Sequence, residues 1–151
     1  MSRVRTGTWS YDVNAEATPA AAMALLSDLT RQGELHPLIT KVEELPPVAG
    51  ALRSYAITDS LRLGPLPFRI TYHADTLSRS DTEVVTVARQ RPRTTIRNRT
   101  TVTPIGSGVH VHVDVELTAP SLLFRYAYRE GRKAHLALAE RIRSVLQASQ
   151  G

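Results

Sequence analysis

The sequence has no cysteine, few aromatic residues, and only two lysines among its 19 basic residues. The absence of cysteine excludes disulfide bonds and thiolate chemistry, and it fits a cytoplasmic protein, which is the location we expect. No apolar run approaches the roughly 20 residues needed to cross a bilayer, so we expect no stable membrane insertion. The first twelve residues lack the charged-then-apolar pattern of a signal peptide, so we expect none.

The net charge of +5 raises the question of an anionic partner. The basic residues are scattered along the chain, and the densest group comprises Arg89, Arg91, Arg93, Arg97 and Arg99. This group has no interleaved aromatic side chains of the kind that stack on bases. The pattern therefore indicates a basic surface, and we expect no nucleic-acid partner.

The length and composition predict one folded domain that spans residues 1–151. A chain of 151 residues can bury roughly two thirds of its unfolded surface in a single core. Its apolar fraction of 42% and charged fraction of 22% are ordinary for a globular protein.

The last thirty residues predict a long amphipathic helix from Ser121 to Gln150. Pro120 and Ser121 mark its start, because a proline and a capping-type side chain precede the first apolar residues. At the helical period one face carries Phe124, Ala127, Tyr128, Gly131, His135, Leu138, Ala139, Ile142, Val145 and Leu146. The first half of this face is mixed and the second half is aliphatic. We therefore expect the mixed half to be the part that covers any cavity.

The rest of the chain predicts one strand, two short helices and six further strands. Residues Arg3–Val13 alternate as a strand does, Thr18-Pro19 begins a helix, and a second helical turn is expected at Arg31–Leu35. The six strands are predicted at Ile39–Leu45, Leu52–Asp59, Phe68–Leu77, Glu83–Gln90, Thr95–Thr103 and Val109–Thr118. This order predicts an α+β domain whose antiparallel sheet folds around the terminal helix.

Charge and apolar alternation predict the pairing of the last two strands. With the turn at Gly106-Ser107-Gly108, Thr103 faces His110, and by the same register Arg99 faces Asp114 and Arg97 faces Glu116. A shift of one residue would bury these charges, so the register is strongly specified. The opposite face, which includes Asn98, must then point at the helix.

The row His110, His112, Asp114 and Glu116 has two readings, a metal site or an exposed polar face. The register pairs its acids with arginines on the solvent side, which favours the polar face. We therefore expect no metal, and no residue pattern calls for a cofactor.

Several polar residues are candidates for the inward face, each with a structural alternative. If the hairpin around Pro92 keeps the same parity, Arg89 faces Ile96 and points inward. It then lies at a cavity mouth, is paired with an acid or an anionic ligand group, or reaches water where the strand frays. Tyr72 and Tyr128 either contact a ligand or pack in the core. His135 is either a satisfied core histidine or the titratable group best placed towards a cavity.

Catalytic motifs are not readable in this sequence. It contains no nucleophile–base pair, no phosphate-binding glycine loop and no paired acids at a credible spacing. Asp59 and Asp75 stand isolated on strands. His36, which precedes Pro37, is either a catalytic residue or, as is more common, a residue that closes the second short helix by a side-chain hydrogen bond.

The segments "TPAAAMALLSDLTRQGELHPLITKVEEL" and "APSLLFRYAYREGRKAHLALAERIRSVL", in this order of elements, resemble the START-like superfamily of polyketide cyclase/dehydrase and lipid-transport proteins (SRPBCC). The resemblance implies a helix-grip fold, in which a curved seven-stranded sheet grips the terminal helix around an apolar cavity. It also implies binding of a lipid, a polyketide or another small hydrophobic molecule, and in some members cyclisation or aromatisation. Residues 64–67 would then lie near the cavity entrance.

Three functional hypotheses follow from the residues and the resemblance together. The first is a protein that binds a small hydrophobic molecule, for which the candidate contacts are Tyr72, Arg89, Asn98, Phe124, Tyr128, Gly131 and His135. Gly131 is expected to leave room above the sheet. The second is a cyclase or aromatase in which His135 or Tyr128 donates a proton and Arg89 holds an enolate-like oxygen. The third is an interaction module with a filled core, with Leu136 and Tyr126 on its surface.

Overall fold

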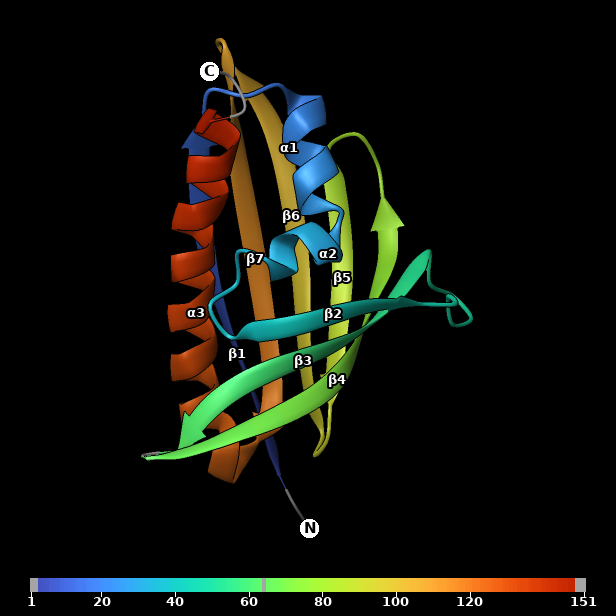
Figure 1. The fold of residues 1–151 in the computed structure, drawn as a ribbon, viewed down its shortest axis with the longest axis vertical. Coiled ribbons are helices and arrows are strands. Elements are labelled where there is room, and N and C mark those ends of the chain that lie inside the picture. The colour runs from blue at the N-terminus through green and yellow to red at the C-terminus, as the bar shows by residue number, and fades with distance from the viewer. Residues whose placement is uncertain (1–2, 64, 149–151) are drawn as a thin grey trace.

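The computed structural model describes residues 3–63 and 65–148, and these form seven strands and three helices (Figure 1). The elements in chain order are β1 (Val4–Ala15), α1 (Pro19–Leu26), α2 (Leu29–Gly33), β2 (Ile39–Leu45), β3 (Arg53–Leu63), β4 (Leu66–Arg79), β5 (Glu83–Gln90), β6 (Thr94–Ile105), β7 (Gly108–Pro120) and α3 (Ser121–Ala148). The end of the predicted terminal helix, at Gln150, lies outside the described residues.

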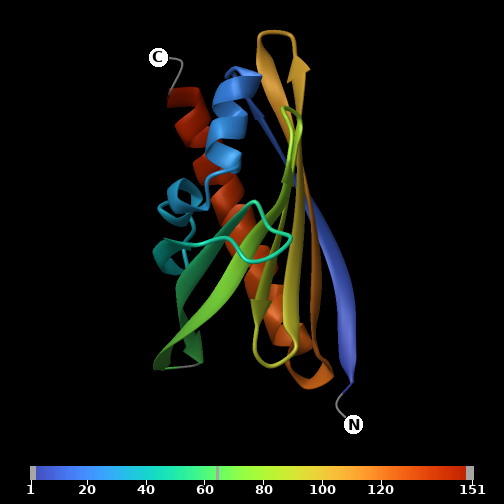
Figure 2. The same cartoon turned by 90° about the vertical axis from the view of Figure 1, so that its right-hand side faces the viewer.

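The seven strands form one antiparallel sheet in the order β1-β7-β6-β5-β4-β3-β2. The sheet curves, so that β2, β3 and β4 cross in front of the long strands, and α3 runs between the two parts (Figure 1, Figure 2). The helix packs mainly against β1 and β7. The predicted α+β architecture, a curved sheet that grips the terminal helix, is confirmed.

Side-chain caps set the starts of the two short helices. The Thr18 hydroxyl accepts a hydrogen bond from the Ala21 amide at 3.1 Å, and Pro19 occupies the first turn of α1. The Asp28 carboxylate accepts from the Thr30 and Arg31 amides. This cap starts α2 at Leu29, two residues earlier than the sequence pattern predicts.

Two hydrophobic clusters hold the fold together. The larger one joins α1, the aliphatic half of α3 with Ile142, and the inward residues of β1 and β7 such as Val13 and Val111. The smaller one is centred on Tyr55, Ile57 and Ala74 of β3 and β4. Residues of both clusters, such as Val113 and Ile57, line one internal cavity.

The pairing of β6 with β7 is as predicted. Thr103 lies opposite His110, Arg99 opposite Asp114 and Arg97 opposite Glu116. The ion pair of Arg99 nevertheless forms with Glu83 of β5, at 2.8 Å between Nε and Oε2. The register prediction is therefore confirmed, while the expected partner of Arg99 is replaced by a nearer carboxylate.

The predicted pairing of β5 with β6 is wrong by one residue. Arg89 lies opposite Thr95 and not opposite Ile96, because Gln90 and Thr94 flank a three-residue turn, 91–93. Arg93 in this turn has a left-handed φ of 40°, as three-residue hairpin turns often require. The shift exchanges the two faces of β5, so Arg89 lies on the outer face of the sheet.

Candidate ligand cavity

A small cavity of about 90 Å³ lies between the sheet and the middle of α3, where the two hydrophobic clusters meet. All seven strands, both short helices and α3 contribute to its wall. Its apolar lining includes Leu26, Ile57, Ala88, Val113 and Leu138. Its polar lining comprises Tyr11, Gln32, His36, Tyr72, Thr86, Asn98, Thr100 and His135.

Two polar atoms of the cavity lining have no hydrogen-bond partner among the described residues. They are Oδ1 of Asn98 on β6 and Nδ1 of His135 on α3, and both atoms are buried. A buried polar atom without a partner costs roughly 1–3 kcal/mol. The cavity therefore holds unsatisfied hydrogen-bonding capacity on two facing elements.

His36 and His135 meet edge to face across the cavity, with ring centroids 5.8 Å apart. His36 Nδ1 accepts a hydrogen bond from the Leu38 amide at 3.2 Å. Its side chain therefore does not close α2 as expected, because α2 ends at Gly33 with Glu34 as its C-cap. Burial lowers the pKa of His36 to about 3 and that of His135 to about 4. Both imidazoles are therefore neutral at neutral pH.

A buried carboxyl lies beside the cavity. The Tyr72 hydroxyl donates to Oδ1 of Asp59 at 3.2 Å, and Tyr72 itself lines the cavity. Burial raises the pKa of Asp59 to about 6, although the hydrogen bond from Tyr72 acts in the opposite direction. The sequence shows Asp59 as an isolated acid, because its partner is brought close only by the pairing of β3 with β4.

The structure brings three of the seven predicted contact residues, Tyr72, Asn98 and His135, to the cavity. Phe124 and Tyr128 lie nearer the start of α3, where their rings stack 5.6 Å apart and the Tyr128 hydroxyl donates to the Thr8 carbonyl. Neither of these two residues lines the cavity.

The space that was expected above Gly131 is filled. A Cβ at this position would lie 3.2 Å from the indole ring of Trp9, which packs under the helix. The expectation of room at Gly131 is therefore wrong. The sequence predicts the correct face of β1 for Trp9. It does not predict that the indole ring packs against α3 at Gly131.

Arg89, the seventh residue, lies on the opposite face of the sheet from the cavity. Its Nη1 donates to Oδ2 of Asp75 at 2.9 Å. The arrangement expected for a cyclase, with His135 or Tyr128 beside Arg89, is thus not assembled, because the three side chains lie in three different places.

Two hydrogen bonds tie α3 to the part of the wall that faces it. Arg141 Nη1 donates to the Leu35 carbonyl at 2.7 Å, beside the cavity residue His36. The Tyr126 hydroxyl donates to the Arg62 carbonyl at 3.2 Å, near the tip of the β3–β4 hairpin. In the segment 64–67, Leu66 and Pro67 belong to β4 and pair with Leu63 and Arg62, while Gly64 lies outside the described residues.

The row of histidines and acids on β7 is part of the outer face. Nε2 of His110 and Nδ1 of His112 lie 2.8 and 2.7 Å from the same carboxylate oxygen of Asp12 on β1. His112 Nε2 also lies 3.0 Å from Asp114 Oδ1, and these contacts raise the pKa of His112. Within residues 3–63 and 65–148, no three metal-ligating side chains are arranged to hold a metal ion.

Comparisons with known proteins find the fold in many solved structures. The di-domain ARO/CYC StfQ from the steffimycin biosynthetic pathway has a TM-score of 0.75 at 11% identity over 96% of this chain. This chain spans about half of that protein, 51% of its length. A START superfamily protein from Mycobacterium smegmatis gives 0.65 at 14% identity, covering 93% of this chain and 97% of that one. Norcoclaurine synthase from Thalictrum flavum gives 0.69 at 13% identity, covering 99% of each chain.

No family model and no curated protein matches the sequence. The structural likeness shows that the chain has the START-like, or SRPBCC-like, helix-grip fold, as the resemblance implies. A second di-domain ARO/CYC protein, BexL from the BE-7585A biosynthetic pathway, is also among the similar structures, with a TM-score of 0.72 at 11% identity. In the described part of the chain, no helix is both long enough and apolar enough to span a membrane.

Proposed function

We propose that this protein binds a small amphipathic molecule in the cavity between α3 and the sheet. The observation that carries the proposal is the pair of buried, unpartnered polar atoms, Asn98 Oδ1 and His135 Nδ1. A core built only for packing gains nothing from such atoms, because each lowers the free energy of unfolding. A ligand hydroxyl can donate to Asn98 Oδ1 and also bond His135 Nδ1, whereas a ligand carbonyl can only accept from His135 Nδ1 in the tautomer that carries its proton there.

The volume of the cavity limits the ligand. About 90 Å³ is less than the roughly 150 Å³ of a cavity that binds benzene. A ligand of a single ring therefore requires a modest expansion of the cavity. A lipid or a polyketide requires a larger expansion. The wall that can move is the one formed by α2 and β2–β4, because α3 packs mainly on β1 and β7 and reaches the opposite wall through the Arg141 and Tyr126 hydrogen bonds.

The lining defines the polarity of the ligand. The apolar side chains match a ring or an alkyl group, and both facing histidines are neutral at pH 7, since burial holds their pKa values at about 3 and 4. Among the residues that the structure describes, no Asp, Glu, Lys or Arg side chain lines the cavity. A neutral ligand is therefore favoured over an anion at this site.

The test is a comparison of phenol with toluene, two ligands of one ring that differ in the hydroxyl group. Amide chemical shifts followed during each titration report both the dissociation constant and the location. Phenol should bind more tightly, with shifts centred on Asn98 and His135. Replacing Asn98 with leucine should remove most of this preference, about tenfold if one hydrogen bond is lost.

The matched control is Asn14→Leu, an exposed asparagine on β1. It should leave the preference for phenol unchanged. Equal affinity for phenol and toluene in the native protein, or shifts that avoid the cavity, would refute the proposal. A total absence of binding by both compounds would favour the module with a filled core.

A further inference from the structure

A second hollow lies on the outer face of the sheet, on the side away from α3. It is an open groove of about 830 Å³, here called the outer groove, between the β2–β3 loop and the β5–β6 turn. Its lining comprises Leu45, Pro46, Val48, Ser54, Ile70, Thr71, Tyr72, His73, Asp75, Arg89, Gln90, Arg91, Arg93, Thr94 and Thr95. Its volume lies in the range of roughly 300–1,000 Å³ that is typical of small-molecule sites.

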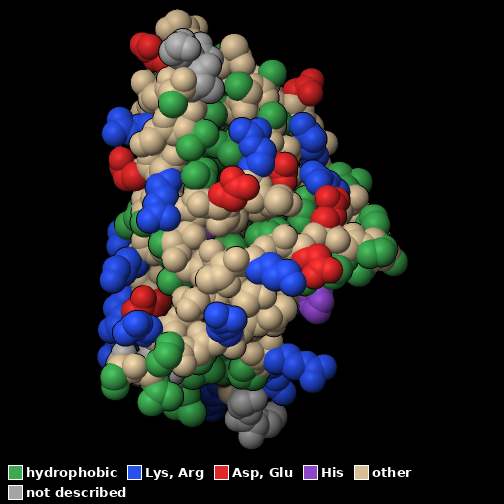
Figure 3. All heavy atoms as spheres, viewed as in Figure 1, with side chains coloured by type: hydrophobic (Ala, Val, Ile, Leu, Met, Phe, Trp, Pro, Cys, Tyr) green, Lys and Arg blue, Asp and Glu red, His purple; other side chains and the backbone are tan. Residues whose placement is uncertain are grey.

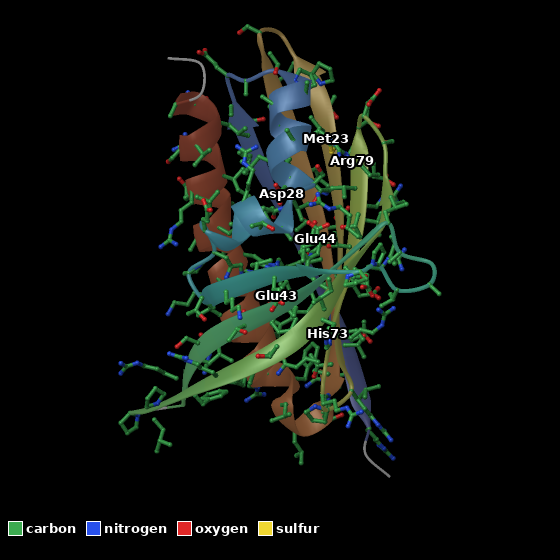
Figure 4. The ribbon with its side chains drawn as sticks, turned by 45° about the vertical axis from the view of Figure 1, so that its right-hand side comes forward. Met23, Asp28, Glu43, Glu44, His73 and Arg79 are labelled. Atoms are coloured by element: carbon green, nitrogen blue, oxygen red, sulfur yellow. The ribbon has the colours of Figure 1, made fainter. Side chains whose placement is uncertain are left out.

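The surface of the outer groove is divided by chemistry. Apolar residues protrude above a histidine at the right-hand edge of the molecule, and a group of basic side chains lies below it (Figure 3). His73 projects from β4, beneath β2 (Figure 4). The β2–β3 loop supplies the apolar wall with Pro46 and Val48, and the β5–β6 hairpin supplies the basic wall with Arg89 and Arg91.

One buried carboxylate fixes both walls. Asp75 is 6% exposed, and its Oδ2 accepts from Arg89 Nη1 at 2.9 Å. Its Oδ1 accepts from the Ser54 hydroxyl at 2.8 Å, and the Ser54 oxygen in turn accepts from the Val48 amide at 3.0 Å. This relay orients the guanidinium of Arg89 and the loop of Val48 at the same time.

The positioned guanidinium keeps donors for a ligand. A guanidinium carries five N–H groups, and the side chain of Arg89 remains 58% exposed while it bonds Asp75 through Nη1. The lining contains three arginines and one aspartate, so its formal charge is positive. Arginine matches carboxylate and phosphate geometry better than lysine does.

We propose that the outer groove binds an amphipathic anion. Its carboxylate or phosphate group contacts Arg89 and Arg91, and its apolar body lies against Pro46 and Val48. This site is distinct from the internal cavity, which lies on the other face of the sheet, although Tyr72 contributes to both linings. The neutral ligand of the cavity and the anion of the groove are different molecules.

The experiment uses three eight-carbon probes, which are octyl phosphate, octanoate and octanol. Amide chemical shifts of the native protein are followed with each probe. We expect octyl phosphate and octanoate to shift the amide signals of Val48, His73, residues 89–91 and residues 93–95, and octanol to leave these signals unchanged. The anion with the lower dissociation constant shows whether the groove prefers phosphate or carboxylate. Added salt should weaken binding of both.

Arg91→Gln is the decisive variant, because Arg91 is exposed in the turn and its loss leaves no buried carboxylate unpaired. The dissociation constant for octyl phosphate should rise about tenfold. Arg143→Gln changes an exposed arginine of α3, on the other side of the sheet from the groove. This variant should leave the dissociation constant for octyl phosphate unchanged. Binding of phenol in the cavity should be the same in both variants.

Three results would overturn the proposal. They are octanol shifts in the groove equal to those of octyl phosphate, an equal loss of affinity in Arg91→Gln and Arg143→Gln, or octyl phosphate shifts confined to the cavity residues. Because phenol binding in the cavity is measured on the same samples, failure of the groove proposal can be told apart from failure of the cavity proposal.

Discussion

Replacement of His135 by glutamine should make the protein less sensitive to mild acid. In the unfolded chain a histidine has a pKa of roughly 6.5, whereas burial lowers the pKa of His135 to about 4 in the folded state. Between these values the unfolded state binds more protons, so the free energy of unfolding falls as the pH falls. The contribution of His135 is complete above pH 6.5 and is lost as the pH approaches 4.

The magnitude follows from the width of this window. From pH 7 to pH 5 the unfolded histidine becomes protonated over about 1.5 pH units, which corresponds to about 2 kcal/mol. Asp59 has the opposite effect on the free energy of unfolding. Because its pKa in the folded state is raised to about 6, protonation of this carboxyl at lower pH stabilises the folded protein. That contribution is shared by both proteins and cancels when they are compared.

The assay is urea denaturation of the native protein and of His135→Gln at pH 7 and at pH 5. We expect the native protein to lose about 2 kcal/mol more than the variant between the two values. His73→Gln, which removes an exposed histidine from β4, controls for the loss of a histidine charge. If the native protein and His135→Gln lose the same stability, His135 is not held neutral by burial.

Three further variants test the packing and the closure of the cavity. Gly131→Leu should lower the free energy of unfolding by about 2 kcal/mol, because the indole ring below already fills the space; unchanged urea denaturation would contradict this. Tyr72→Phe should raise the pKa of Asp59 above its value of about 6, since a hydrogen bond to the carboxylate is lost; an unchanged carboxyl titration by NMR would contradict this. Arg141→Ala should speed amide exchange around residues 35–38 several-fold, and Arg143→Ala should not; equal rates in the two variants would contradict this.

The fold can be predicted from the sequence because the patterns that specify it are local or repeat along a single strand or helix. The aliphatic half of α3 and the alternation of β7 each specify which face is buried, and the charges of β6 and β7 specify their register. The cap at Thr18 likewise lies within a few residues of the helix that it starts. Such patterns depend on the residues within one or two elements.

The site was only partly readable because its contacts join distant elements. Asn98 and His135 follow from strand and helix periodicity, which places them on the inward faces. The sequence places Arg89 on the wrong face because one extra residue in the turn exchanges the inward and outward faces of β5. No charge pattern in β5 fixes the length of that turn. Trp9 fills the space over Gly131 only through packing of β1 on α3, which no local pattern encodes.

The most direct test of the cavity is native mass spectrometry of the protein purified from its own host, beside Ala88→Leu. Ala88 lines the cavity, and a leucine there adds three carbons to a space of about 90 Å³. Ala24→Leu, at an exposed position of α1, is the control. We predict that the native protein and the control carry one neutral small molecule that Ala88→Leu lacks. If all three proteins carry the same molecule, or if none carries one and phenol also fails to bind, the cavity is not the ligand site.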